Sequence, residues 1–174
     1  QLEIMNDVRQ RLAAFPGMRV SVQNISLISG GGFRQTHIMS AADYDNDGWV
    51  DLVVSRPWEV PLLLHKEKGR FVDVTTSMGL VTAEQMKEGR RWFTWAQAWA
   101  DVDLDGDLDL YLTDLGLRAP ISVLEKKPQS SRLYINEGTR FVDRTEEWGL
   151  LRWLEDKPFF GVAFGDEDGD GYPD

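Results

Sequence analysis

Aspartates recur in three nine-residue stretches of this sequence, at spacings that suit metal coordination. The stretches are 43–51, 101–109 and 166–174, and each reads D-x-D-x-D-G-x-x-D. Carboxylates at positions 1, 3, 5 and 9 can converge on one hard cation, while the glycine at position 6 permits a sharp turn and position 7 offers its backbone carbonyl. The pattern predicts calcium-binding turns, and three copies in register argue against a chance match.

The segments that flank these loops have the composition of β-strands. A small-and-aromatic segment precedes each loop, at 38–42, 96–100 and 161–165, and β-rich runs follow the first two loops at 52–55 and 110–113. Branched and aromatic residues without helical periodicity favour buried strands that enter and leave a turn.

The repeated unit is larger than the loop. Residues 64–71 match 134–141, which indicates a hairpin with a glycine turn, and the match continues through 71–80 and 141–150. Each unit therefore contains a strand, an acidic turn, a second strand, a variable stretch, a hairpin and a connector. A period of about 60 residues, with four strands in each period, is typical of propeller blades.

Together, loop and flanks resemble the FG-GAP/VCBS repeats, and most of all the bacterial type found with ASPIC/UnbV modules. The resemblance covers residues 34 to 174. It implies an all-β fold of about two and a half β-propeller blades, incomplete, stabilised by calcium as in the head of integrin α-subunits. The resemblance also implies about three Ca²⁺ per chain, one for each loop.

The ligands that the resemblance implies are four carboxylates and one backbone carbonyl in each loop. By loop, with the carbonyl donor last, they are Asp43, Asp45, Asp47, Asp51 and Trp49; Asp101, Asp103, Asp105, Asp109 and Asp107; and Asp166, Asp168, Asp170, Asp174 and Tyr172.

The units divide the chain into four expected segments. Residues 1–33 should form an amphipathic helix, ended by Pro16-Gly17, and a strand; 34–90 and 91–156 should form two blades; and 157–174 should begin a third, truncated blade. A propeller closes with about four to eight blades, so we expect further blades or neighbouring subunits to complete it. The start at Gln1 suggests a mature form or a fragment.

Composition limits the function classes. Apolar residues make up 42% of the 174 residues, which is enough for a folded core, and the formal net charge of −10 argues against nucleic acid as a partner. The absence of cysteine excludes disulfides and thiolate zinc sites. The sequence contains no apolar run of membrane-spanning length and no recognisable signal peptide.

Other readings of the loops fit less well. An EF-hand requires glutamate at position 12, where Val54 and Leu112 stand. Acidic surface turns without an ion stay open as an alternative. No H-E-x-x-H, G-x-S-x-G or Walker motif occurs, and His37 and His65 favour structural or solvated roles over catalysis.

The expected function is a non-catalytic, extracellular or periplasmic module that contacts a protein or a glycan. Trp49, Trp58 and the insertion 116–131 are candidate contacts, whereas Trp99 holds a repeat position that predicts a place in the core between blades. The competing interpretation is a calcium-dependent hydrolase, or an accessory subunit of a redox or surface complex, whose active groups lie outside this segment.

Overall fold

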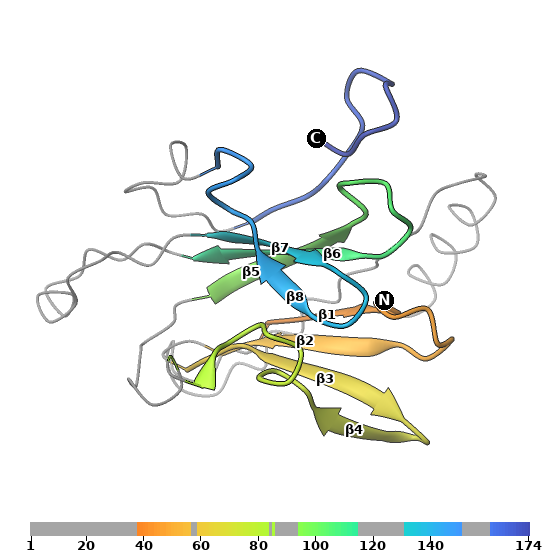
Figure 1. Cartoon of the computed structure of the whole chain (residues 1–174), viewed down its shortest axis with the longest axis vertical. Coiled ribbons are helices and arrows are strands. Elements are labelled where there is room, and N and C mark those ends of the chain that lie inside the picture. Colours follow the sequence, from red (N-terminus) through yellow and green to blue (C-terminus); the bar gives the residue numbers. More distant parts are fainter. Residues whose placement is uncertain (1–37, 57–58, 84, 86–93, 115–130, 151–160) are drawn as a thin grey trace, which may run out of the picture.

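The described part of the chain forms two four-stranded antiparallel sheets, each of which follows the chain in order (Figure 1). This computed structural model describes residues 38–56, 59–83, 85, 94–114, 131–150 and 161–174. The strands of the first sheet are β1 (Ile38–Ala42), β2 (Asp51–Ser55), β3 (Leu62–Glu67) and β4 (Arg70–Asp73). Those of the second are β5 (Thr94–Ala100), β6 (Asp109–Asp114), β7 (Arg132–Asn136) and β8 (Phe141–Asp143).

Each sheet has the form of one propeller blade, which confirms the predicted all-β class. In both sheets an acidic loop joins the first two strands, and the ladder closes on a matching pair, Ala42 with Asp51 and Ala100 with Asp109. The last residue of each acidic loop is therefore also the first residue of the following strand.

The predicted hairpin of the first sheet turns at Lys68 and Gly69. Both residues have positive φ, 50° and 80°. Two central residues of this kind form the tight turn whose twist matches that of antiparallel strands, and glycine adopts the conformation without steric cost. The turn sets the register of β3 on β4, with Glu67 opposite Arg70.

The main hydrophobic core lies at the junction of the two sheets. Tyr44 of the first unit stacks on Trp99 of β5, with ring centroids 6.3 Å apart and planes 7° from parallel. Phe141 of β8 packs against both rings, 5.5 Å from Tyr44 and 6.1 Å from Trp99. Trp99 is buried in this cluster, as its repeat position predicted.

Polar contacts also cross this junction. The Trp99 indole donates a hydrogen bond to Ser40 Oγ at 3.0 Å, and the Gln97 amide donates to the carbonyls of Ile38 and Val53. The backbone N–H of Phe141 donates to the Met78 carbonyl at 2.7 Å. Buried donors and acceptors are costly when they lack partners, so these pairings fix how one sheet sits on the other.

A smaller core forms where the third unit meets the second sheet. Phe164, at the repeat position of Trp99, meets Tyr111 edge-on at 6.2 Å and packs with Leu150 against Ala100 and Val102. The helix and strand predicted for 1–33 lie outside the described residues. Within the residues that can be described, no helix is long and apolar enough to cross a membrane.

Candidate metal centre

The aspartate at position 9 of the first two loops is buried and held by a neighbouring strand. Asp51 and Asp109 are 0% and 1% exposed. Oδ1 of Asp51 accepts from the backbone N–H of Lys66 at 2.7 Å, and Oδ1 of Asp109 accepts from that of Asn136 at 2.8 Å. These donors are in β3 and β7, so the hairpin of each sheet positions the last carboxylate of its own loop.

The rest of each loop is shaped by hydrogen bonds from backbone N–H groups to its own carboxylates. The position 1 aspartate accepts from the position 6 glycine in all three loops: Gly48 to Asp43 at 3.1 Å, Gly106 to Asp101 at 3.0 Å and Gly171 to Asp166 at 2.9 Å. The position 5 aspartate likewise accepts from position 7: Trp49 to Asp47, Asp107 to Asp105 and Tyr172 to Asp170. The shared sequence thus produces a shared local fold.

Carboxylate oxygens gather in every loop, although not all predicted ligands join one group. Potential ligand atoms within 4.8 Å of one another come from four sets: Asp43, Asp45 and Asp47; Asp45, Asp51 and His65; Asp101, Asp103 and Asp109; and Asp166, Asp168 and Asp174. Asp105 and Asp170 lie outside these groups. The backbone carbonyls of Trp49, Asp107 and Tyr172 stay predicted ligands.

Three buried carboxylate oxygens in the first two loops lack a hydrogen-bond partner. They are Oδ1 of Asp43, Oδ2 of Asp51 and Oδ1 of Asp101. A buried carboxylate oxygen without a partner destabilises the folded state, because it has lost its hydrogen bonds to water and has no others in their place. A cation bound to such an oxygen would remove that cost, so the donors of each loop fit a divalent metal ion.

Burial also perturbs the acidity of the loop carboxyls. Burial raises the pKa of Asp109 to about 6, partly offset by the N–H groups of Asn136 and Val102. Burial likewise raises the pKa of Asp51 and of Asp103. The folded protein thus holds carboxylates where their charged form is disfavoured, and a bound cation is the usual compensation.

Residues 43–112 match the family described as an FG-GAP-like repeat. This part of the chain is an FG-GAP-like repeat. The match begins at the first ligand position of loop one and ends within β6, so it includes both of the first two loops. No curated protein matches the chain significantly. The ASPIC/UnbV-associated type stays a prediction.

The first two loops also contact each other, in part through Asn136 of β7. The Asn136 side chain donates to the Tyr44 carbonyl at 2.9 Å, while its backbone N–H holds Asp109. The Asn46 amide donates to the Asp107 carboxylate at 3.0 Å. The first two candidate centres therefore lie side by side and share polar contacts.

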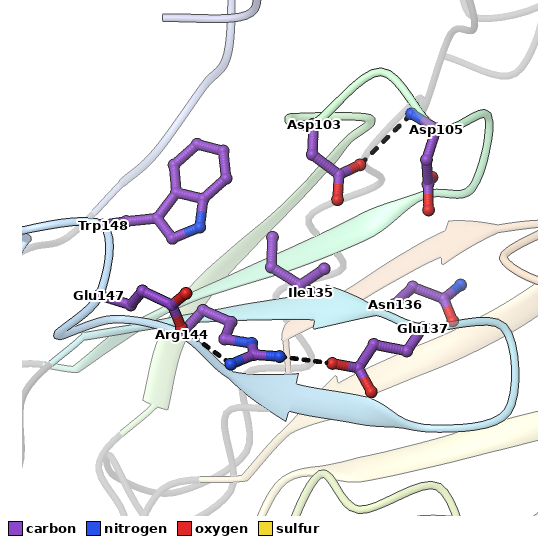
Figure 2. Close-up of a pocket in the computed structure, with 8 residues that line it drawn as sticks. All are labelled: Asp103, Asp105, Ile135, Asn136, Glu137, Arg144, Glu147 and Trp148. Carbon is purple, nitrogen blue, oxygen red and sulfur yellow. Dashed lines mark hydrogen bonds and ion pairs between the residues drawn. The ribbon is translucent and has the colours of Figure 1, made fainter.

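A hollow of about 260 Å³ opens beside the second loop (Figure 2). Trp148, which is 45% exposed, and the Arg144 guanidinium line it opposite Asp103. Arg144 bonds both Glu137 and Glu147, at 2.7 and 2.8 Å. The sequence reasoning missed Trp148, although its place in the repeated connector was visible.

His65 is the other residue whose position the sequence did not foresee. Its Nδ1 lies 3.1 Å from Asp51 Oδ1 and 3.3 Å from Asp45 Oδ2. The contact crosses from β3 to the loop, and no sequence spacing marks it.

Of the candidate partner contacts, Trp49 is exposed, and the Lys66 ammonium lies over its ring at 4.9 Å from the centroid. Trp58 lies outside the described residues.

Proposed function

We propose that this chain is a calcium-binding β-propeller module that displays a surface to a protein or glycan partner outside the cytoplasm. The observation that carries the proposal is the set of buried carboxylate oxygens without hydrogen-bond partners in the first two loops, Asp43 Oδ1, Asp51 Oδ2 and Asp101 Oδ1. Oxygen-only loops of this kind suit hard cations, and calcium accepts six to eight such ligands in flexible geometry.

Calcium in these loops would act mainly as a structural brace. Each loop connects the first two strands of a sheet, and its position 9 aspartate is bonded to the third strand in the first two units. An ion that binds the folded loop alone would stabilise the fold by about 2.7 kcal/mol for each independent site at a calcium concentration of 100 times Kd. Extracellular calcium is abundant enough to support this role, which favours a location outside the cytoplasm.

The hollow beside the second loop offers a contact surface which, by the repeat, suits either the next blade or a separate protein partner. It combines an exposed indole, Trp148, with the carboxylates of Asp103 and Asp105 and the Arg144 guanidinium. Exposed tryptophan and arginine are enriched at protein interfaces, and an indole face can also stack on a sugar ring. No ligand of known identity is assigned to this surface.

A calorimetric calcium titration of the chelator-stripped chain tests the proposal, with bound metal counted before stripping. We expect about three calcium ions per chain, one for each repeated loop, and a higher melting temperature in calcium. Asp103→Ala should lose or weaken one site, because the exposed Asp103 contributes to the second ligand group. Glu59→Gln removes one negative charge outside the loops and is the matched control.

Two results would contradict the proposal. One is a chelator-stripped chain that is folded and takes up no calcium. The other is an equal loss of calcium affinity in Asp103→Ala and Glu59→Gln, which would assign the binding to general charge rather than to the loop.

A further inference from the structure

The first loop has a neighbouring imidazole that the second loop lacks. His65 in β3 and Ile135 in β7 hold the same repeat position, because Leu64 pairs with Leu52 as Tyr134 pairs with Leu110. Only the imidazole carries a ligand atom, and it contacts the position 9 aspartate Asp51. The two loops should therefore differ in metal preference even though their aspartates match.

The imidazole lies at coordination spacing from two carboxylates. Its Nδ1 is 3.1 Å from Asp51 Oδ1 and 3.3 Å from Asp45 Oδ2. Two ligand atoms bound about 2.1 Å from one ion, at angles between octahedral and tetrahedral, lie about 3.0–3.4 Å apart. Both nitrogen–oxygen separations thus fall in the range that a small divalent ion requires, and the ligand atoms of all three residues lie within 4.8 Å of one another.

A second observation points to a missing ligand at this place. Asp51 is fully buried, and its Oδ2 makes no well-formed hydrogen bond, although the Tyr44 backbone N–H lies near enough to Asp51 to favour its charged form. The Tyr44 ring meets the His65 ring edge-on at 6.2 Å and is itself buried, so the imidazole is packed against the junction core. The His65 side chain keeps 20% exposure, which leaves access for an ion from solvent.

The chemistry of the donors selects the class of ion. Calcium takes oxygen ligands, whereas an imidazole nitrogen suits Zn²⁺ and other first-row transition ions. We propose that Asp45, Asp51 and His65 form a mixed nitrogen and oxygen site in the first loop, which binds a transition-metal dication such as Zn²⁺ or Cu²⁺ more tightly than the second loop does. The proposal rests on the metal-binding role of the loops given above.

Reciprocal exchange of the two repeat positions tests the site. Zn²⁺ is titrated into the chelator-stripped chain and into His65→Ile and Ile135→His. We expect His65→Ile to weaken the tightest Zn²⁺ site at least about tenfold, the lower end of the loss seen when even an outer partner of a metal ligand is removed. Ile135→His should add a second site of similar affinity.

His37→Gln is the matched control, because the sequence contains only these two histidines. It should leave Zn²⁺ affinity unchanged. A His65→Ile chain that binds Zn²⁺ as tightly as the original chain overturns the proposal, and so does loss of the site in His37→Gln. The first result would reduce the His65 contact to a hydrogen bond with Asp51, and the second would assign the Zn²⁺ site to His37.

A spectroscopic measurement on the unaltered sequence covers the case in which His65→Ile fails to fold. With Cu²⁺ bound, pulsed electron paramagnetic resonance should show coupling to an imidazole nitrogen in the original chain and in His37→Gln. The absence of that coupling overturns the proposal.

Calcium binding is measured on the same samples to separate the two claims. Calcium uptake without a His65-dependent Zn²⁺ site overturns only the mixed site. A His65-dependent Zn²⁺ site without calcium uptake overturns the proposed calcium role and supports the mixed site.

Discussion

The two junctions that flank the second sheet use matching residues but are filled to different extents. At the first junction, Phe141 is 2% exposed and its N–H bonds to the Met78 carbonyl. At the second, Trp148 holds the place of Met78 in the repeat, yet it is 45% exposed and lines the hollow in Figure 2. The connector, residues 74–80 and 144–150, forms the same turn in both units, so residues within the connector determine its conformation. Its burial, in contrast, depends on the neighbouring sheet.

Removal of the aromatic side chain at each junction, Trp99 or Phe164, should give the largest difference in the free energy of unfolding. Trp99→Ala should reduce the free energy of unfolding by about 4 kcal/mol, because it removes a buried indole and leaves Ser40 without its donor. Phe164→Ala should cost about 1–2 kcal/mol, since Phe164 is only partly buried. Urea unfolding of both variants measures the difference.

Trp99→Phe separates packing from hydrogen bonding in that experiment, because it keeps a ring and removes the indole donor. Equal losses for Trp99→Ala and Phe164→Ala would mean that the two junctions are equally filled in solution.

Substitution of the position 9 aspartates should give the second-largest difference in stability. Asp109→Ala leaves the N–H groups of Asn136 and Val102 buried without partners, and we expect a loss of about 3 kcal/mol in excess calcium. Asp174 accepts from Glu167 within its own exposed loop, so, apart from any loss of bound calcium, Asp174→Ala should cost less than about 1 kcal/mol. Chemical denaturation in calcium compares them, and a larger loss for Asp174→Ala would reverse the ranking of the two loops.

The closeness of the first junction is tested by two glycines with the same backbone conformation. Gly79 and Gly69 have φ of 77° and 80°, so alanine strains both turns by about 1 kcal/mol. A Cβ at Gly79 would also lie 2.8 Å from the Phe141 carbonyl oxygen, whereas nothing lies within 4 Å at Gly69. Gly79→Ala should therefore destabilise the fold by about 1–2 kcal/mol more. Matching melting curves for the two variants would place the sheets farther apart.

Much of the fold was encoded in local sequence. The three acidic loops, the strands that flank the first two and the Lys68-Gly69 turn were predictable, because each depends on residues close together in the chain. The buried strand predicted at 161–165 was wrong, since those residues are exposed or half-buried and form no strand. The core position of Trp99 followed from the alignment of repeats. The all-β class and the family were confirmed by the sheets and by the match over 43–112.

The sequence alone could not predict which residues of different strands and loops contact one another. Phe71 and Phe141 occupy the same repeat position, but Phe71 is 47% exposed and Phe141 is almost fully buried. The approach of His65 to Asp51 and Asp45 likewise depends on the pairing of β3 with β2, not on spacing within a motif. The predicted ligand sets themselves stay predictions until an ion is measured.

The double role of Asn136 has a consequence for how the loops fill. Its backbone N–H holds a carboxylate of the second loop, and its side chain holds a carbonyl in the first. An ion that orders one loop would therefore spare part of the ordering cost of the other, which is the thermodynamic origin of positive cooperativity. Uptake of the first two ions should then follow a steeper isotherm than independent sites allow, with β7 as the physical link between them.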